Sequence, residues 1–332
     1  MKTPVAVLLA LWIASSQAAS TEPALSLSKD SGQPYPTKPI RVLAPFPAGS
    51  GVDVVARMIG TPLGQNVGQA VVVDNRPGAA GRIACELAAR AAPDGYTLLL
   101  GNASTLAMLP SLDKRVAFDP VKSFAPIALI SSSANVLVVH PSISATNVPS
   151  LITLAKAKPR ALNYGSAGSG NSTHLAAELF KLTAGVDLVH VAYKGTPPMI
   201  VDLLTGQIQL SFTSILSALP HIQQGRLRAL GVTSLKRAVS LPDVPTISEA
   251  GLKNYEMVVW QGLLAPANTP RAIVARLNEE VLKILQMPDT RERLAAQGLE
   301  PVGGTLEQFA TYIVSEAAKW SKVIRSAGIT PE

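Results

Sequence analysis

Short apolar runs alternate with amphipathic segments along most of the chain. Residues 40–44 are largely apolar and β-branched, which predicts a buried strand. Val55, Ile59 and Leu63 then recur at helical spacing and share one face of a helix. Runs at 71–73 and 97–100 predict two further strands around an Ala-rich helix. Strand and helix in alternation at this spacing are typical of a doubly wound α/β sheet.

The same alternation continues through the second half of the chain. Apolar runs predict further strands at residues 136–139, 162–164, 188–191, 208–212, 227–232 and 257–260. Helical periodicity lies between these strands at residues 151–157 and 175–182, and after the last of them at residues 273–284. The length of the chain allows two lobes, each with its own core.

We therefore expect an α/β protein of two doubly wound lobes around a ligand cleft. One lobe comprises residues 37–138 and 256–332, and the other comprises residues 139–255. Hinge motion is expected where the chain crosses between them, near residues 135–141 and 252–260.

Two helix starts carry recognisable caps. Thr269 is expected to be an N-cap with Pro270 at the first helical position. Thr305 and Gln308 have the spacing of a capping box for the last helix, which Gly328 is expected to end.

The N-terminus reads as a processing segment. A basic start, an apolar core and a small-residue cleavage site predict a signal peptide at residues 1–18, followed by a flexible lead at residues 19–36. We expect export to the periplasm.

Cys85 is the single cysteine, so no intrachain disulfide can form, and it is expected to be a small buried residue on a helix.

Composition excludes several function classes. The chain has 29 Lys and Arg against 22 Asp and Glu, a net charge of +7, which mildly favours acidic ligands or a membrane surface. The basic residues are scattered and aromatic residues are few, so nucleic-acid binding is not expected. The four histidines are far apart in sequence, so no metal is expected. Val54 and Thr173 stand where a dinucleotide fingerprint needs glycine, so no cofactor is expected either.

Two glycine-rich loops give the main functional signal. Residues 45–53 and 164–172 each follow a predicted strand and open a predicted helix. Such a loop aims backbone N–H groups and the positive end of a helix dipole at one point, which suits an anion such as a carboxylate. Glycine-rich turns also occur for steric reasons alone. The presence of two, both rich in hydroxyl or amide side chains, favours a ligand held between the lobes.

The candidate binding residues lie at the carboxyl ends of the predicted strands, where open α/β sheets bind ligands. Asp53 could cap the first helix or touch the ligand, capping being the commoner role. Lys194 could be a counter-charge for the ligand or a solvated loop residue. The set is Phe46, Ala48, Gly49, Ser50, Gly51, Asp53, Asn102, Ser104, Ser166, Gly168, Ser169, Gly170, Asn171, Ser172, Lys194 and Ser214.

Catalysis finds little support. A nucleophile elbow needs glycine two residues before and after the serine, and neither Ser166 nor Ser169 has both. An exported α/β hydrolase would have to rely on Ser172 and His174, a poor pair. A histidine at this position more often packs at the helix start or bonds to the loop.

Several longer motifs resemble one family. Residues 35–57 contain Pro-Phe-Pro-Ala-Gly, residues 72–101 contain Asn-Arg-Pro-Gly-Ala-Ala-Gly, and residues 241–251 read Leu-Pro-Asp-Val-Pro-Thr-Ile-Ser-Glu-Ala-Gly. Residues 164–180 and 193–206 match as well. The chain thereby resembles the extracytoplasmic solute receptors of tripartite tricarboxylate transporters, often called Bug proteins, over nearly its whole mature length.

The resemblance implies a type II-like periplasmic-binding-protein fold that closes around a small carboxylate. In the family the two loops matching residues 46–53 and 166–172 hold it through amides, hydroxyls and bridging waters. Ser50, Val52, Ser169 and Asn171 depart from the commonest family pattern, which leaves the ligand's identity open. The resemblance also implies a monomer that delivers its ligand to a membrane permease. Docking to a signalling kinase is the alternative.

Overall fold

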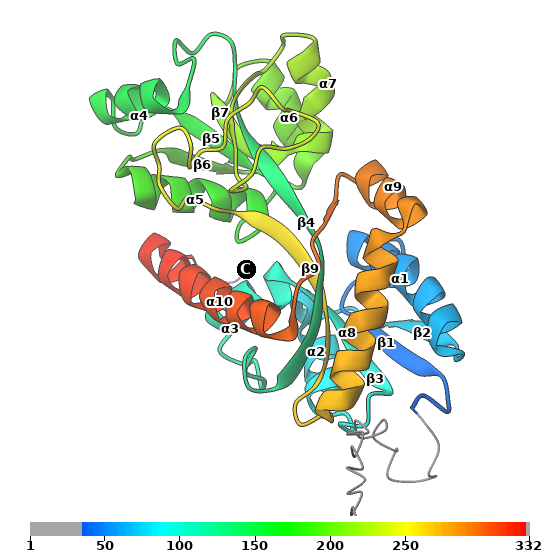
Figure 1. The fold of residues 1–332 in the computed structure, drawn as a ribbon. Coiled ribbons are helices and arrows are strands. Elements are labelled where there is room, and N and C mark those ends of the chain that lie inside the picture. Colours follow the sequence, from blue (N-terminus) through cyan, green and yellow to red (C-terminus); the bar gives the residue numbers. More distant parts are fainter. Residues whose placement is uncertain (1–34, 330–332) are drawn as a thin grey trace, which may run out of the picture.

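The computed structural model describes residues 35–329, and its ten strands within that range form one curled sheet (Figure 1). The order of the strands is β2-β1-β3-β9-β4-β7-β5-β6, and β8 and β10 also pair with β4. β4 (Phe124–Val139) and β9 (Val258–Pro266) run antiparallel through the middle of the molecule. The predicted two-lobed α/β fold is confirmed.

One lobe is built on a parallel sheet of three strands next to β9. Alternation along β1 sorts its side chains between two layers of helices. Ile40 and Val42 face a core made with α1 and α8, whereas Leu43 faces a core made with α2 and α10. The elements are β1 (Ile40–Ala44), α1 (Gly51–Val67), β2 (Val71–Asn75), α2 (Arg82–Ala89), β3 (Thr97–Asn102), α3 (Leu109–Leu112), α8 (Arg271–Gln286), α9 (Pro288–Ala296), β10 (Glu300–Pro301) and α10 (Leu306–Ala327).

The other lobe repeats the plan with β5 parallel to both β6 and β7. Its two layers again follow the alternation of a strand, because Leu137 and Val139 of β4 face α5 while Val136 and Val138 face α6 and α7. The elements are α4 (Val148–Ala157), β5 (Asn163–Ser166), α5 (Ser172–Ala184), β6 (Val189–Ala192), α6 (Thr196–Leu204), β7 (Leu210–Ser214), α7 (Ile215–Gln223) and β8 (Arg228–Val232).

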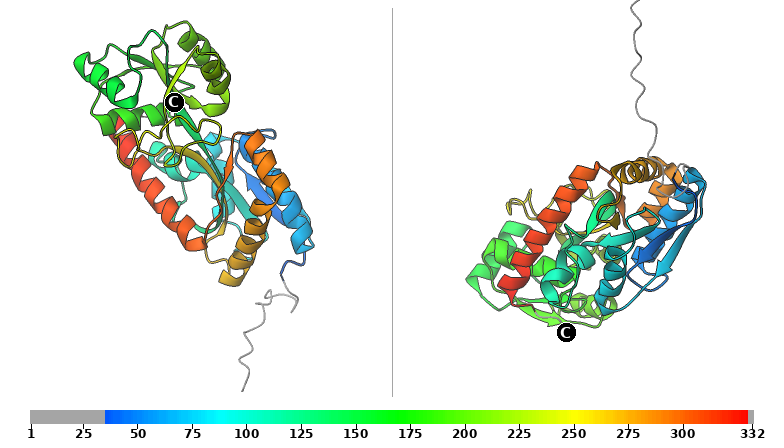
Figure 2. Two further views of the ribbon diagram at one scale, coloured as in Figure 1. Left: turned by 45° about the horizontal axis from the view of Figure 1, so that its top comes forward. Right: turned by 90° about the horizontal axis from the view of Figure 1, so that it is seen from below.

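The sheet passes from one lobe to the other within β4. Residues up to Ala134 pair with β9, and residues from Asn135 onward pair with β7 and β8. The predicted hinge segments adjoin this change of partner. The residue limits set for the two lobes stay a prediction. The last helix, α10, also lies against α5 of the other lobe, as both views in Figure 2 show.

Some local expectations need correction. Thr269 does not cap α8, because its hydroxyl donates to the Pro266 carbonyl oxygen at 2.8 Å and Pro270 takes the N-cap position. The predicted strand at residues 136–139 is only the end of β4. Tyr35 falls in the predicted flexible lead, yet it is buried and its hydroxyl donates to the Gly95 carbonyl oxygen at 2.7 Å.

Other expectations hold. The Thr305–Gln308 capping box and the left-handed Gly328 cap bound α10 as predicted. Cys85 is fully buried on α2, and burial raises the pKa of its thiol to about 12. No helix within residues 35–329 has the length and apolar character needed to cross a bilayer. The predicted signal peptide lies outside the described residues.

Candidate ligand-binding site

The first glycine loop is held by reciprocal capping bonds. Ser50 is the N-cap of α1, and its Oγ accepts the N–H of Asp53 at 3.3 Å. The Asp53 carboxylate in turn accepts the N–H of Gly49 at 2.8 Å. Together these bonds fix the turn from β1 into α1.

Asp53 is the centre of this turn. Its buried carboxylate also accepts hydrogen bonds from Arg57 and from the Asn75 side-chain amide, at 3.0 Å each. Burial alone would raise its pKa, but the bonds from Arg57, Gly49 and Asn75 lower it below the ordinary value. The carboxylate therefore stays ionised and holds the loop, which is the capping role considered for it.

The capping leaves a small group of donors free. Within residues 35–329 no hydrogen bond takes up the N–H groups of Ala48, Gly51 and Val52. The first turn of a helix has no internal partner for its N–H groups and carries the positive end of the dipole. Ala48 and Gly51 are exposed. This end of α1 therefore offers hydrogen-bond donors to an anion.

The end of β3 lies next to that loop. Asn102 caps the π-helical turn Ala103–Met108 through a capping box with Thr105. A Cβ built on Gly81 would lie 2.5 Å from the Thr105 methyl group and 3.6 Å from the Phe46 ring. The structure thus brings Phe46 and the Asn102 turn together around Gly81, with Ser104 partly exposed beside them.

The second glycine loop is also tied internally. Asn171 is the N-cap of α5, and its Oδ1 accepts the N–H groups of Thr173 and His174 at 2.9 and 3.1 Å. The N–H of Gly168 donates to Ser166 Oγ, and the N–H of Gly170 donates to His174 Nδ1. These amides shape the loop and are not free donors in this conformation.

The other predicted site residues of this lobe have free N–H groups within residues 35–329 or exposed side chains. The N–H groups of Ser169 and Ser172 have no hydrogen-bond partner within residues 35–329. Lys194 is exposed after β6, where Gly195 N–H donates to the Ala167 carbonyl oxygen of the loop. Ser214 is exposed at the end of β7 and caps α7 by accepting the N–H of Ser217. The ends of β5, β6 and β7 therefore share one edge.

The residues around the first glycine loop and those around the second belong to different lobes. A Cβ built on Gly170 would lie 3.9 Å from Leu112 of α3, so the second loop reaches the lobe that carries the first. Within residues 35–329 no hydrogen bond joins the two glycine loops directly.

A row of buried polar side chains crosses the sheet beside the end of β3. Asn102 pairs in register with Gln261 of β9, and Gln261 pairs with Ser131 of β4. Gln261 Oε1 and Ser131 Oγ are buried and have no partner within the described chain. Buried polar atoms normally have a partner. This row is not among the predicted site residues, although a glutamine inside the apolar run at residues 258–266 could have indicated it.

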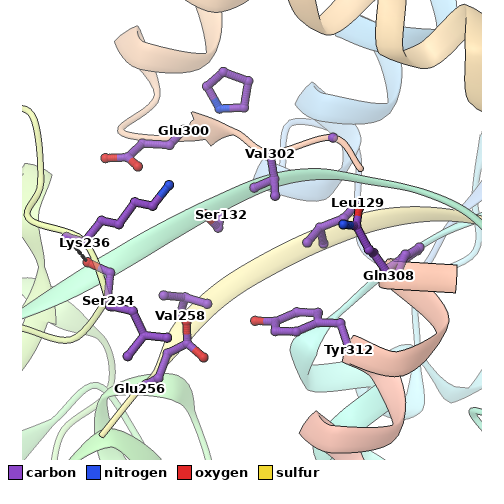
Figure 3. Close-up of a pocket in the computed structure, with 14 residues that line it drawn as sticks. Leu129, Ser132, Ser234, Lys236, Glu256, Val258, Glu300, Val302, Gln308 and Tyr312 are labelled. Atoms are coloured by element: carbon purple, nitrogen blue, oxygen red, sulfur yellow. Dashed lines mark hydrogen bonds between the residues drawn. The ribbon is translucent and has the colours of Figure 1, made fainter. Parts of the chain in front are cut away.

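A cavity of about 490 Å³ opens elsewhere, against the crossing strands (Figure 3). In Figure 3 Tyr312 extends from α10 toward Val258 of β9, with Glu256 nearby and Lys236 across the space. Burial raises the pKa of Glu256, which the charge of Lys319 partly offsets. None of the predicted site residues lines this cavity.

No group of three or more His, Cys, Asp or Glu side chains within residues 35–329 is arranged to hold a metal ion. The histidines that come closest, His174 and His190, stack on each other at 3.9 Å between ring centroids.

Known proteins share this architecture. BugT of Bordetella pertussis is 36% identical over 303 residues, which cover 90% of this chain and 92% of that protein. The solved structure of R. palustris Rpa4515 with adipate is 36% identical, covers 90% of this chain and 100% of that one, and has a TM-score of 0.70.

A TctC solute-binding protein from Polaromonas, solved with no ligand, is 27% identical. It covers 88% of this chain and 99% of that one, with a TM-score of 0.80. Residues 55–329 match the model of the family described as "Tripartite tricarboxylate transporter family receptor". The chain belongs to this receptor family.

Proposed function

We propose that this chain is a periplasmic receptor that closes its two lobes around a small carboxylate and delivers it to a membrane permease. The proposal rests on the pair of capped helix starts, one in each lobe, each with N–H groups that have no hydrogen-bond partner among residues 35–329. Ala48, Gly51 and Val52 supply them at α1, and Ser169 and Ser172 supply them at α5.

The binding step follows from these donors. A hydrogen bond from an N–H group to a carboxylate contributes about 1.5–3 kcal/mol net. Four to six such bonds support roughly micromolar affinity after the costs of association. Closure excludes water, which strengthens each bond in the lower local dielectric.

The buried row of Asn102, Gln261 and Ser131 adds orientation. Gln261 Oε1 and Ser131 Oγ have no partner within the described residues, and they lie in register with Asn102 at the end of β3, beside the first loop. A bound water or a ligand hydroxyl satisfies such atoms, because a buried acceptor without a donor is costly.

The way the lobes are joined supports a clamp, because β4 pairs with β9 in one lobe and with β7 in the other. Hinge closure about β4 and β9 is the corresponding motion.

Adipate is the first ligand to test, because a family member binds it. Isothermal titration calorimetry would compare adipate with shorter dicarboxylates, with citrate and with adipamide, which is uncharged. We expect at least one carboxylate to bind with roughly micromolar affinity and adipamide not to bind. A panel in which no carboxylate binds would contradict the proposal.

Matched variants locate the binding. Ser169→Asp places a negative charge on the exposed rim of the second loop and should abolish carboxylate binding. Ser240→Asp, on an exposed residue outside both loops, should leave binding intact. Delivery is tested by adding the purified receptor to spheroplasts that lack it and measuring uptake of the labelled ligand.

A further inference from the structure

Two histidines form the base of the second glycine loop. His174, on the first turn of α5, and His190, on β6, stack with their ring planes 7° apart and their centroids at 3.9 Å. Tyr164 of β5 stacks on His190 at 4.9 Å. Three elements that carry the loop thus meet in one aromatic group.

Each imidazole holds one end of the loop. His174 Nδ1 accepts the N–H of Gly170 at 2.9 Å. His190 Nε2 lies 2.7 Å from Ser166 Oγ, and that hydroxyl donates to the Gly168 carbonyl oxygen at 3.1 Å. The backbone between Ser166 and Gly170 therefore takes its shape from the two rings.

We propose that the stacked pair of His174 and His190 positions the second ligand loop, and that protonation of the pair releases the loop and weakens ligand binding. The inference rests on the proposed function, since it assigns a role to residues behind the same binding loop. Neither histidine is expected to touch the ligand.

The charged groups around the pair fix its state at neutral pH. Because His174 Nδ1 accepts a hydrogen bond, its proton resides on Nε2, which lies 3.8 Å from Glu178 Oε1. Glu178 is already bonded to the Tyr164 hydroxyl at 2.5 Å and to Lys181 at 2.8 Å. The ammonium group of Lys181 therefore offsets part of the carboxylate's charge.

Burial lowers the pKa of His174 to about 4, and the neighbouring His190 adds to the effect against the opposing pull of Glu178. Burial likewise lowers the pKa of His190. Both rings are therefore neutral at pH 7. Two imidazolium ions at 3.9 Å between centroids would repel each other, so the pair cannot readily carry two charges.

Protonation of His174 changes the loop directly. A proton on Nδ1 would face the N–H of Gly170, placing a donor against a donor. Gly170 would have to turn away, and the adjacent N–H of Ser169, a proposed ligand donor, would move with it. Acid therefore acts on ligand affinity through the backbone of the loop.

Two variants of His174 separate the hydrogen bond from the ring. In His174→Asn the amide Oδ1 lies close to the position of the imidazole Nδ1 and cannot be protonated. This variant should therefore keep adipate affinity within a few-fold of that of the original protein. Phe keeps the stacked ring but removes the acceptor, so His174→Phe should lower affinity by about tenfold or more. Thermal melting checks that each variant folds, and His140→Asn, on an exposed turn after β4, is the control.

The dependence of ligand affinity on pH distinguishes the proposed role from a merely structural one, which would not depend on protonation of His174. Adipate itself titrates in acid, so the quantity measured is the ratio of the affinities of the original protein and His174→Asn. We expect this ratio to be constant above about pH 6 and to fall toward about pH 4. A flat ratio, or a His174→Phe variant that binds as well as the original, would overturn the inference.

Nuclear magnetic resonance tests the same idea without a ligand. The imidazole nitrogens of His174 should show an unprotonated Nδ1 at pH 7, and the Gly170 amide signal should shift with the His174 midpoint. If no carboxylate binds but these signals titrate together, the proposed function fails while the positioning role stands. If carboxylates bind and the Gly170 signal is independent of His174, only the inference fails.

Discussion

The indole Nε1–H of Trp260, on β9, donates to the carboxylate of Glu316, on α10, at 2.9 Å. The same carboxylate accepts the indole N–H of Trp320 at 3.1 Å and pairs with Lys319. Glu316 and both tryptophans are almost fully buried. One acidic side chain therefore fastens the last helix to a strand that joins the two lobes.

Removing that carboxylate should strongly destabilise the protein. Glu316→Ala leaves two buried indole donors without an acceptor and removes the ion pair with Lys319, so the free energy of unfolding should fall by about 3–5 kcal/mol. Glu316→Gln keeps an acceptor oxygen and should cost about 1–2 kcal/mol. Chemical denaturation measures both. Equal losses in the two variants would show that the charge, and not the acceptor, matters.

Gly81 and Gly68 form a matched pair with left-handed backbones, at φ of 92° and 74°. A Cβ at Gly81 would lie 2.5 Å from the Thr105 methyl group and 3.0 Å from Pro45, whereas nothing lies within 4 Å of one at Gly68. Gly68→Ala should cost about 1 kcal/mol from backbone strain alone. Gly81→Ala should cost about 2–4 kcal/mol, because overpacking adds to the strain.

The variants Gly81→Ala and Gly68→Ala should also differ in their affinity for adipate. Gly81→Ala displaces Thr105, the capping partner of Asn102, and should weaken adipate binding. Gly68→Ala, at the far end of α1, should leave it unchanged. Equal stability losses in the two variants would argue against the close packing of the first loop on the Asn102 turn.

The core strands were predictable because their own sequence dictates them. The run at 40–44 is a strand over those same residues, and the capping box at Thr305 starts α10 as expected. The first part of β4 was not predictable from its own sequence. It contains Pro126 and three consecutive serines, and it is a strand because β9 and β10 pair with it.

The two glycine loops could be recognised in the sequence, but which of their backbone N–H groups are free to bind a ligand could not. Whether an amide is available depends on which side chain reaches it in the folded chain. Gly49 is taken by Asp53 four residues later, and Gly170 is taken by His174. Sequence spacing marks the turn, whereas the choice of partner is decided by side-chain packing behind it.

Asp53 should contribute to stability in a pH-dependent way. Its folded pKa is lowered, so its stabilisation is fully present above the unfolded pKa of about 3.9 and is lost as the pH falls through the folded value. We expect Asp53→Asn to lower the free energy of unfolding by about 1.5–3 kcal/mol at pH 7. The difference from the original protein should shrink below about pH 4.

Chemical denaturation across pH measures this difference. Asp187→Asn, whose carboxylate is exposed and lies 3.8 Å from Arg160, is the control and should show little change. A difference for Asp53→Asn that stays constant down to about pH 2 would show that ionisation is not the source of its stabilisation.

Salt should affect carboxylate binding only modestly. Neutral amides supply the proposed donors, and screening acts mainly on exposed charge pairs. Raising sodium chloride from about 0.05 to about 0.5 M should lower adipate affinity less than about threefold. Lys194→Ala should behave like the original protein. A steep salt dependence that disappears in Lys194→Ala would assign Lys194 as the counter-charge.

Bulk at the first loop should block the ligand without unfolding the protein. Ser50 is only partly exposed and stands where β1 turns into α1, so the indole of Ser50→Trp would project over the free N–H groups of the helix start. Loss of the cap costs about 1 kcal/mol, and Ser50→Ala measures that loss alone. Calorimetry should detect no adipate binding by Ser50→Trp and weakened binding by Ser50→Ala, with both variants folded. Unchanged affinity in Ser50→Trp would remove the first loop from the binding site, because no carboxylate can reach those amides past an indole ring.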